Sequence, residues 1–249
     1  MFIKKSGFTL IELSIVLLIL FLITGGIIGG SKLISNAKLQ NLIKEIVSYQ
    51  NQLVVFKNTY RYLPGNMPNA TDYHPNVVDG NGNLSYSQPN GTATKRTENF
   101  RIFDHLNAFG FNDFKPTTST GTTVNIGKTV PLSNSFKLVG FSFYSIFYGT
   151  SVISNPNEFD NDYNNVMVVG KERFNSYSIN PFLTGSQALK IDTKMDNGDP
   201  TTGKIYSVKK DSALANECTT SNDLSTAEYN LSKGDEEICF VGYRKVDEW

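Results

Sequence analysis

One acidic residue lies inside an apolar segment close to the amino terminus. The segment runs from Phe8 to Gly30, and Glu12 is the only charged residue in it. A carboxylate at the centre of a lipid bilayer costs about 2.5–3.5 kcal/mol, and the cost falls toward the headgroups. In a membrane, Glu12 either reaches water near the surface or meets a positive charge that offsets its own. The second interpretation makes Glu12 the first candidate functional residue of the chain.

Two groups of acidic residues have a spacing that a calcium ion could use. They are Glu158, Asp160 and Asp162 in one predicted loop, and Asp192, Asp196 and Asp199 in another. Calcium prefers carboxylate oxygens, but Lys171 occupies the place where the first group would need the bidentate glutamate of an EF-hand. We interpret both groups as solvated turns. Calcium is the alternative, and it is the only candidate cofactor.

The stretch from Asp79 to Asn83 alternates an acid or amide side chain with glycine, as calcium-binding loops do. It lacks the glutamate at the twelfth position of an EF-hand loop, so we interpret it as a plain turn. The chain around it, from Tyr62 to about Gly91, is rich in Asn, Gly, Pro and Asp, which is typical of a surface loop.

Cys218 and Cys239 are the only cysteines, and His74 and His105 are the only histidines. Beyond a membrane, such a cysteine pair meets an oxidising compartment and forms a disulfide, which the loop-closure model values at about 3 kcal/mol. A metal ion held by the two thiolates is the alternative. Neither histidine belongs to a metal-binding or catalytic motif, and the chain contains no nucleophile elbow, phosphate loop or HExxH sequence. We therefore expect no catalytic residue and no enzyme activity.

The apolar segment has the length of a membrane-spanning helix. Its 23 residues, Phe8 to Gly30, form about 35 Å of helix, against roughly 30 Å for the hydrocarbon core of a bilayer. Lys4 and Lys5 precede it, so the positive-inside bias keeps the amino terminus in the cytoplasm and places the chain after about Ser31 on the other side. An ordinary secretory signal peptide, cut near the glycines that end the segment, is the alternative.

A single long helix continues beyond the membrane segment. Between Leu39 and Phe56, apolar residues recur every three to four positions, which predicts an amphipathic helix. Together with the apolar segment it forms one helix from about Thr9 to about Thr59. Pro64 follows at the place where this helix must stop.

The remaining chain predicts a head made of helices and strands. We expect helices over 97–109 and 180–194, and strands over 136–153, 166–169, 205–208 and 238–246. Asn180 and Pro181, a cap followed by proline at the first helical position, place the start of the second helix. The order of elements indicates an α+β fold dominated by antiparallel strands. No second domain boundary is evident, so residues 61–249 form one head.

The composition excludes one class of function. Lys and Arg together number 23, as do Asp and Glu, so the chain carries no net charge. This balance excludes the electrostatic footprint of a dedicated nucleic-acid binder. Aromatic residues make up 12% of the chain, which argues against disorder.

Residues Lys4 to Leu13, with the sequence KKSGFTLIEL, resemble the leader and mature start of type IV pilins and pseudopilins. The resemblance implies that a prepilin peptidase cuts between Gly7 and Phe8, and that the new amino terminus of Phe8 is methylated. It also implies that Glu12 pairs with the amino terminus of a neighbouring subunit during assembly.

The resemblance further implies how the chain is organised and where it works. Residues 1–7 would be the leader, 8–30 the transmembrane and assembly half of the helix, 31–60 its amphipathic half, and 61–249 the head. The amphipathic half would lie against an antiparallel β-sheet. The implied partners are prepilin peptidase, other pilin or pseudopilin subunits, and an inner-membrane assembly platform with its ATPase. The head would face the periplasm of a bacterium before the subunit joins a pilus or pseudopilus.

Other features of the chain are also typical of this family. A Leu63-Pro64-Gly65 turn follows the predicted helix, and the two cysteines close a loop near the carboxyl terminus. Some pseudopilins bind calcium in a loop of the head. The size of the head favours a minor or specialised subunit. The alternatives are a minor pilin that binds a ligand in adhesion or DNA uptake, and a periplasmic protein released by ordinary signal cleavage.

Overall fold

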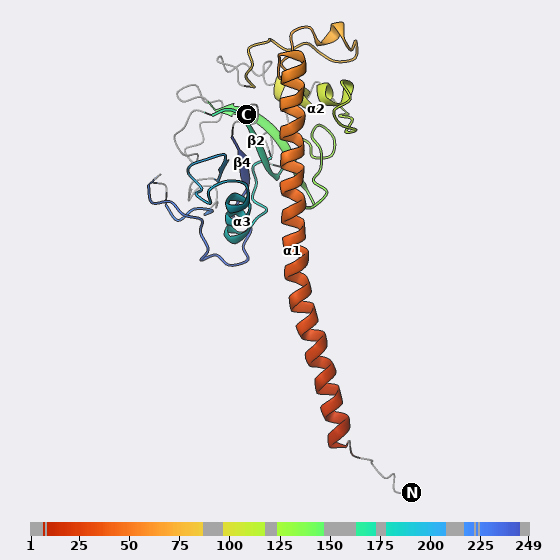
Figure 1. Ribbon diagram of the computed structural model, residues 1–249, viewed down its shortest axis with the longest axis vertical. Helices are drawn as coiled ribbons and strands as arrows, with labels where there is room; N and C mark the ends of the chain where they lie inside the picture. Colours follow the sequence, from red (N-terminus) through yellow and green to blue (C-terminus); the bar gives the residue numbers. More distant parts are fainter. Residues whose placement is uncertain are drawn as a thin grey trace.

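Helix α1 (Leu10–Tyr60) is the longest element and projects far beyond the rest of the chain (Figure 1). The computed structural model describes residues 7, 9–86, 97–117, 124–146, 163–172, 178–207, 217–221, 223 and 225–244. α1 spans 51 residues without a break, as its hydrophobic pattern predicts. This corresponds to roughly 75 Å at about 1.5 Å per residue, more than twice the thickness of the hydrocarbon core of a membrane.

Local hydrogen bonds set both ends of α1. At the start, the Thr9 side chain accepts a hydrogen bond from the Glu12 N–H, and the Glu12 carboxylate accepts one from the Thr9 N–H, which makes a capping box. At the end, Arg61 takes the left-handed conformation with φ 67° and donates its N–H to the Lys57 carbonyl. The helix therefore ends at Tyr60, one residue beyond the expected end.

A four-stranded antiparallel sheet forms the centre of the head. Its strands are β1 (Val139–Ile146), β2 (Tyr163–Lys171), β3 (Ile205–Tyr206) and β4 (Val241–Tyr243), in the order β1-β2-β4-β3. Strand β2 lies between β1 and β4, with Val169 opposite both Phe141 and Val241. This order places β4, the last strand in the sequence, between β2 and β3. The long helix and the antiparallel sheet confirm the predicted α+β class.

The second half of α1 supplies one wall of the hydrophobic core. Leu42, Ile46 and Leu53 are completely buried. The ring centroid of Tyr49 lies 4.7 Å from that of Phe141 in β1. The apolar stripe predicted from the sequence is therefore the face of α1 that contacts the head.

The loop that follows α1 leads to the second helix. It contains one turn of 3₁₀ helix, η1 (Ala70–Asp72), and it is described as far as residue 86. Helix α2 (Thr97–Ala108) lies where the sequence predicts it, and Phe100 and Phe103 are buried, as its helical spacing of aromatic residues indicates. Loop and helix together cover the end of the head around the carboxyl end of α1 (Figure 1).

Helix α3 (Gly185–Met195) begins later than predicted, so the expected start at Asn180 and Pro181 was wrong. Asn180 instead forms a backbone bridge with Lys171 at the end of β2. The helix starts only after this bridge, where the Thr184 side chain accepts a hydrogen bond from a backbone N–H of the first turn. Long-range strand pairing thus outweighs the local signal of the proline.

The strands also differ from the predicted ranges. β1 begins at Val139, after a turn over 134–138, and β2 is longer than the predicted 166–169. β4 begins at Val241, since Cys239 pairs with Leu183 instead. The predicted strand positions 147–153, 208 and 245–246 lie outside the described residues.

Candidate functional site

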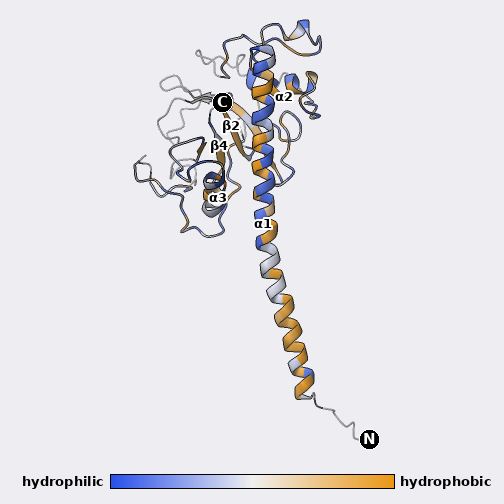
Figure 2. Cartoon of the chain, in the orientation of Figure 1, coloured by the Kyte–Doolittle hydropathy of each residue, from blue (hydrophilic) through white to orange (hydrophobic). Residues whose placement is uncertain are grey.

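The first half of α1 consists mainly of apolar residues and projects away from the head (Figure 2). Fifteen large apolar side chains between Leu10 and Ile34 are 48–87% exposed, although such side chains are normally buried. Among the described residues, α1 is the one helix long and apolar enough to cross a membrane. A contiguous apolar surface of this size marks an interaction site, and the described residues of the chain do not cover it.

Two uncharged polar side chains of this segment, those of Ser14 and Thr24, donate hydrogen bonds to the helix itself. Ser14 Oγ donates to the Ile11 carbonyl at 2.9 Å, and Thr24 Oγ1 donates to the Leu20 carbonyl at 2.9 Å. The glycines at 25, 26, 29 and 30 face open space, because a Cβ on any of them would meet no described atom within 4 Å beyond the adjoining residues and the nearby backbone of α1 itself. This part of α1 therefore has room for the close approach of another helix, which small residues permit in membranes.

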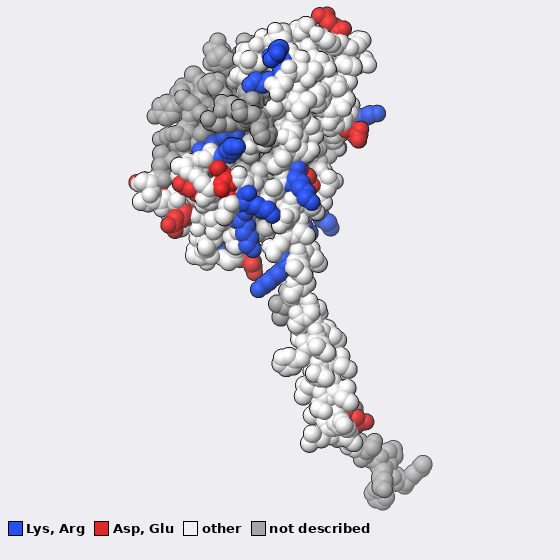
Figure 3. Space-filling model, viewed as in Figure 1, with Lys and Arg blue, Asp and Glu red and all other residues white. Residues whose placement is uncertain are grey.

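Glu12 is the charged side chain of this segment, and its hydrogen bonds are local. Its Oε2 accepts from the Thr9 N–H and from the Thr9 hydroxyl, both at 2.8 Å. Figure 3 shows the projecting part of α1 almost without other charge. Gly7 is exposed, and Phe8 lies outside the described residues. The cut between Gly7 and Phe8 stays a prediction, with Glu12 in the first turn of the helix that follows it.

Cys218 and Cys239 form the predicted disulfide, with their Cα atoms 4.9 Å apart. Backbone bonds hold the bridge beside the start of α3, since the Leu183 N–H donates to the Cys239 carbonyl at 3.0 Å and the Cys239 N–H donates back at 2.9 Å. Within the closed loop, the Tyr229 hydroxyl donates to Asp192 of α3 at 2.7 Å. The disulfide loop is thus attached at two separate places, to Leu183 just before α3 and to Asp192 within α3.

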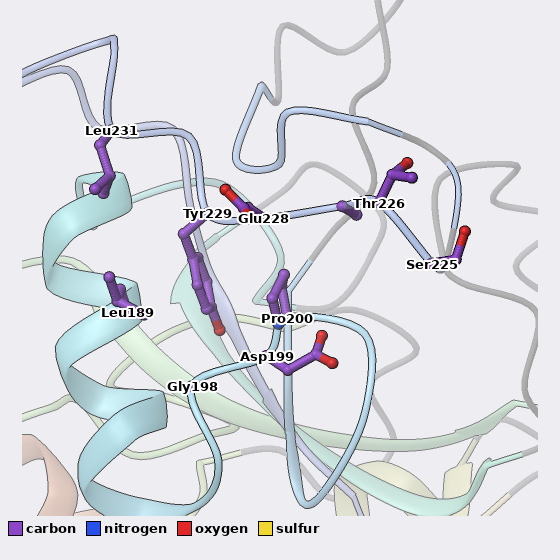
Figure 4. Close-up of a pocket in the computed structure, with 10 residues that line it drawn as sticks. Leu189, Gly198, Asp199, Pro200, Ser225, Thr226, Glu228, Tyr229 and Leu231 are labelled. Carbon is purple, nitrogen blue, oxygen red and sulfur yellow. The ribbon is translucent and has the colours of Figure 1, made fainter.

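A cavity of about 430 Å³ lies between the disulfide loop, α3 and the loop that follows α3 (Figure 4). Leu189 and Leu231 lie at one end of the cavity, and Ser225 and Thr226 lie at the other, with Asp199 between them. The volume falls at the lower end of the range for small-molecule sites. Its described lining offers hydroxyl groups, carboxylates and two leucines, so it can accept hydrogen-bond donors on one side and apolar groups on the other.

Asp192 is a completely buried residue of α3. Its carboxylate accepts hydrogen bonds from the Tyr229 hydroxyl and, at 3.0 Å, from the Gly198 N–H. Burial raises the pKa of Asp192 to about 6, because the interior disfavours the charged form, and the nearby carboxylates of Asp196 and Asp199 add to this effect. Asp192 therefore connects two loops to α3.

The other acids of the predicted calcium groups are used in turns or lie outside the described residues. Asp199 accepts from the Thr201 N–H at 2.8 Å, and Asp196 accepts from the Lys204 N–H. Among the described residues, no three His, Cys, Asp or Glu side chains are placed to hold a metal ion. The structure does not bring Asp192, Asp196 and Asp199 together as a calcium site. The other predicted group, Glu158, Asp160 and Asp162, lies outside the described residues.

The two histidines have structural surroundings. His105 of α2 is completely buried, and its Nε2 donates to the Val78 carbonyl at 2.9 Å, which joins the loop before α2 to the helix. Burial lowers the pKa of His105 to about 4, and burial raises the pKa of the neighbouring Asp104 to about 6. The ring of His74 lies 4.6 Å from the ring of Phe109. Both rings therefore contribute to packing at the end of the head.

Sequence reasoning missed one polar cluster between the loop 61–86 and α2. In this cluster the completely buried Asn66 lies among Asn81, Asn83 and Glu98. The alternation from Asp79 to Asn83 is visible in the sequence. Its acidic partner Glu98 comes from α2, which is why a search for a glutamate inside the same loop does not find it.

No family model, no curated protein and no solved structure matches the chain. Its own residues and geometry are therefore the basis for assigning a function. Two features stand out: the exposed apolar half of α1 with its single carboxylate, and a head closed by a disulfide.

Proposed function

We propose that this chain is a type IV pilin-like structural subunit, in the role of a minor pilin or pseudopilin. The observation that carries the proposal is the division of α1 into an exposed apolar half with one carboxylate and a half that packs into the head. A membrane can hold such an apolar helix, and a bundle of neighbouring helices can later replace the lipid. The sequence KKSGFTLIEL at the start of the helix supports the processing step.

Processing would create a positive charge near Glu12, and no described residue forms an ion pair with this carboxylate. Cleavage after Gly7 gives a new amine at Phe8, four residues and about 6 Å of helix from Glu12. Among the described residues, Thr9 supplies both donors to Glu12 Oε2, its N–H and its hydroxyl. A staggered neighbour offers a charged amine, which is a stronger partner. Since a buried charge without a partner is strongly unfavourable, this pairing selects one axial register between neighbouring helices.

The proposed setting is the inner membrane of a bacterium, with the head in the periplasm. Lys4 and Lys5 would remain in the cytoplasm until prepilin peptidase removes the leader. The periplasm is oxidising, which is compatible with the disulfide between Cys218 and Cys239. An ATPase-driven assembly platform would then move the apolar half of α1 from lipid into the filament, together with other pilin or pseudopilin subunits.

The amino terminus of the protein in its native filaments tests this proposal. Mass spectrometry of sheared filaments is expected to find the chain, beginning at Phe8 with one added methyl group. A chain that still begins at Met1 would contradict processing. A chain that begins near Ser31 would contradict the structural role, because it would have lost the apolar half of α1.

A further inference from the structure

Four oxygen atoms from the loop 81–85 and from α2 converge on the side chain of Asn66. Its Nδ2 lies 2.9 Å from Asn81 Oδ1, 2.9 Å from Asn83 Oδ1, 3.1 Å from Glu98 Oε2 and 3.4 Å from the Ser85 carbonyl. Asn66 is completely buried, and Glu98 is only 5% exposed. Asn81 and Asn83 are exposed residues of the loop, and their side-chain oxygens turn toward the buried Asn66. The cluster therefore joins a buried carboxylate to amide oxygens at the surface.

The oxygens around Asn66 outnumber the hydrogens that it can donate. A side-chain amide nitrogen carries two hydrogens, whereas four oxygens surround this one. A rotation of the Asn66 side-chain amide by half a turn exchanges its nitrogen and oxygen. The Asn66 oxygen then takes the place of Nδ2 and becomes the fifth oxygen of the cluster. After this turn the Asn66 oxygen would lie 2.9–3.4 Å from each of the other four oxygens, as Nδ2 does now. Neighbouring ligands of a calcium ion, which holds each ligand at about 2.3–2.6 Å, have a similar spacing.

We propose that this cluster binds a calcium ion. The ligands would be the side-chain oxygens of Asn66, Asn81 and Asn83, the Ser85 carbonyl and the Glu98 carboxylate. The loop offers an oxygen at every second residue, as an EF-hand loop does at its third, fifth and seventh positions, the seventh through its backbone. Glu98 supplies from α2 the carboxylate that an EF-hand loop takes from its own twelfth position.

The chemistry of these ligands selects a class of cation. Amide, carbonyl and carboxylate oxygens are hard ligands that suit Ca²⁺ and disfavour the metals that bind nitrogen and sulfur. Mg²⁺ requires a smaller octahedral site and keeps several of its waters, so an all-protein set of five oxygens suits calcium better. We therefore expect the cluster to bind Ca²⁺ more tightly than Mg²⁺.

The charge around the cluster points to weak binding. Glu98 is the one carboxylate among the five ligands, because Asp79 turns its own carboxylate to the Thr71 N–H at 2.8 Å. The guanidinium of Arg101 lies close by and donates to the Asp79 carbonyl at 2.9 Å. The Leu84 N–H, which donates to Asn66 Oδ1 at 2.8 Å, would also lose its acceptor when the amide turns. We expect a Kd of about 10⁻⁴–10⁻³ M, as in extracellular calcium modules.

Calcium at this place would join the chain that follows α1 to the first turn of α2. Both segments lie at the end of the head that is farthest from the exposed half of α1 (Figure 1). No ligand belongs to α1, so the site is independent of the proposed role in filaments. Its effect would be to stiffen the end of the head.

Thermal unfolding of the full chain in detergent tests the proposal. The protein is treated with a chelator, transferred to chelator-free buffer and titrated with CaCl₂ or MgCl₂ at constant ionic strength. Calcium at about twenty times its Kd should raise the Tm of the head by about 4–7 °C. Magnesium should have a much smaller effect. The absence of a rise at ten times the highest expected Kd, or an equal rise with magnesium, would overturn the proposal.

Three variants separate a cation site from a plain hydrogen-bond network. Glu98→Gln should lose the calcium response, and the matched control Asp79→Asn should keep most of it, because its carboxylate faces Thr71. Asn66→Asp puts a second carboxylate beside Glu98, so it should lower the Tm without calcium and tighten calcium binding about tenfold. If Asn66→Asp lowers the Tm equally with and without calcium, the proposal is wrong, and this holds even where Glu98→Gln fails to fold.

Discussion

The two halves of α1 place similar side chains in opposite surroundings. Leu17, in the first half, is 53% exposed, whereas Leu42, in the second half, is completely buried against the head. Complete burial of a side chain of this size contributes about 1.5–3 kcal/mol relative to exposure. The second half uses this contribution to hold the head together. The apolar side chains of the first half stay exposed, so the same contribution is gained only on contact with lipid or with other helices.

The two halves of α1 therefore differ in what they contact: the second half packs into the head, and under the proposed function the first half serves assembly. The capping box at Thr9 and Glu12 belongs to the first half, and the aromatic contacts of Tyr49 and Phe56 belong to the second. A substitution in one half should therefore leave the function of the other half intact. Four predictions test this separation.

Glu12→Ala should have the largest effect, and the effect should fall on assembly alone. The variant removes the partner of the Phe8 amine, and an unpaired buried charge costs about 3–5 kcal/mol. We expect the chain to be cleaved and inserted into the membrane but nearly absent from filaments. Its amount in sheared filaments, relative to its amount in the membrane, measures the effect.

Thr24→Ala is the matched control for this prediction. It also removes a polar side chain from the first half, but Thr24 bonds to the Leu20 and Phe21 carbonyls of its own helix. This variant should assemble as the parent chain does. Normal filaments from Glu12→Ala would contradict the assigned role, and a lower Tm of its head would contradict the separation of the two halves.

Leu42→Ala and Leu17→Ala make the same change in the two halves. At the completely buried Leu42 it should lower the free energy of unfolding of the head by about 2–5 kcal/mol. At Leu17, which is 53% exposed, the change should stay within about 0.5 kcal/mol in detergent. Denaturant unfolding of the two variants compares them directly. Equal losses would show that the first half also contributes to folding.

Loss of the disulfide should destabilise the head without affecting the exposed half of α1. The double variant Cys218→Ala with Cys239→Ala should lower the free energy of unfolding by about 3 kcal/mol, because the unfolded chain gains freedom when the loop opens. Calorimetry under non-reducing conditions measures the difference. Reduction of the parent chain should reproduce it, and reduction of the double variant should have no further effect. If the disulfide does not stabilise the head, the double variant will melt like the parent chain, and reduction will not change the melting curve of the parent chain.

The smallest effect is a pH dependence that belongs to Asp192. Its native pKa of about 6 lies above the usual 3.8, so the stability gained from holding this proton is fully present below about pH 4 and is lost as pH rises through about 6. Between pH 5 and 7.5 the head should lose about 1 kcal/mol through this group. Asp192→Asn, which cannot ionise, should remove this part of the pH dependence of the free energy of unfolding. Leu17→Ala should keep it. If the pH dependence of Asp192→Asn equals that of the parent chain, it does not belong to Asp192.

The elements that follow from local patterns could be predicted from the sequence. The long helix and its stop follow from apolar spacing and from Pro64, and strand β2 follows from a run of apolar residues that includes Val168 and Val169. The disulfide between Cys218 and Cys239 also follows, because the chain contains no other cysteines. Each of these features depends on residues that are close in sequence or have one possible partner.

The features that depend on distant residues could not be predicted. The late start of α3 results from the bridge between Asn180 and Lys171, which only the fold brings together. The cluster at Asn66 combines a loop with Glu98, which lies 32 residues away. In both cases a local signal was present, a proline in one and an alternation with glycine in the other. The structure that forms at each signal depends on a distant partner residue, which the local sequence does not identify.

The most direct test of the account measures the distance between the Phe8 amine and Glu12 on different subunits. Filaments are assembled from a mixture of chains, one half with ¹⁵N-labelled phenylalanine and the other with ¹³C-labelled glutamate, and solid-state NMR detects dipolar coupling to the resolved amine nitrogen. The account predicts a coupling that places a glutamate carboxyl within about 4 Å of that amine. Filaments that form without any such coupling between subunits would contradict it.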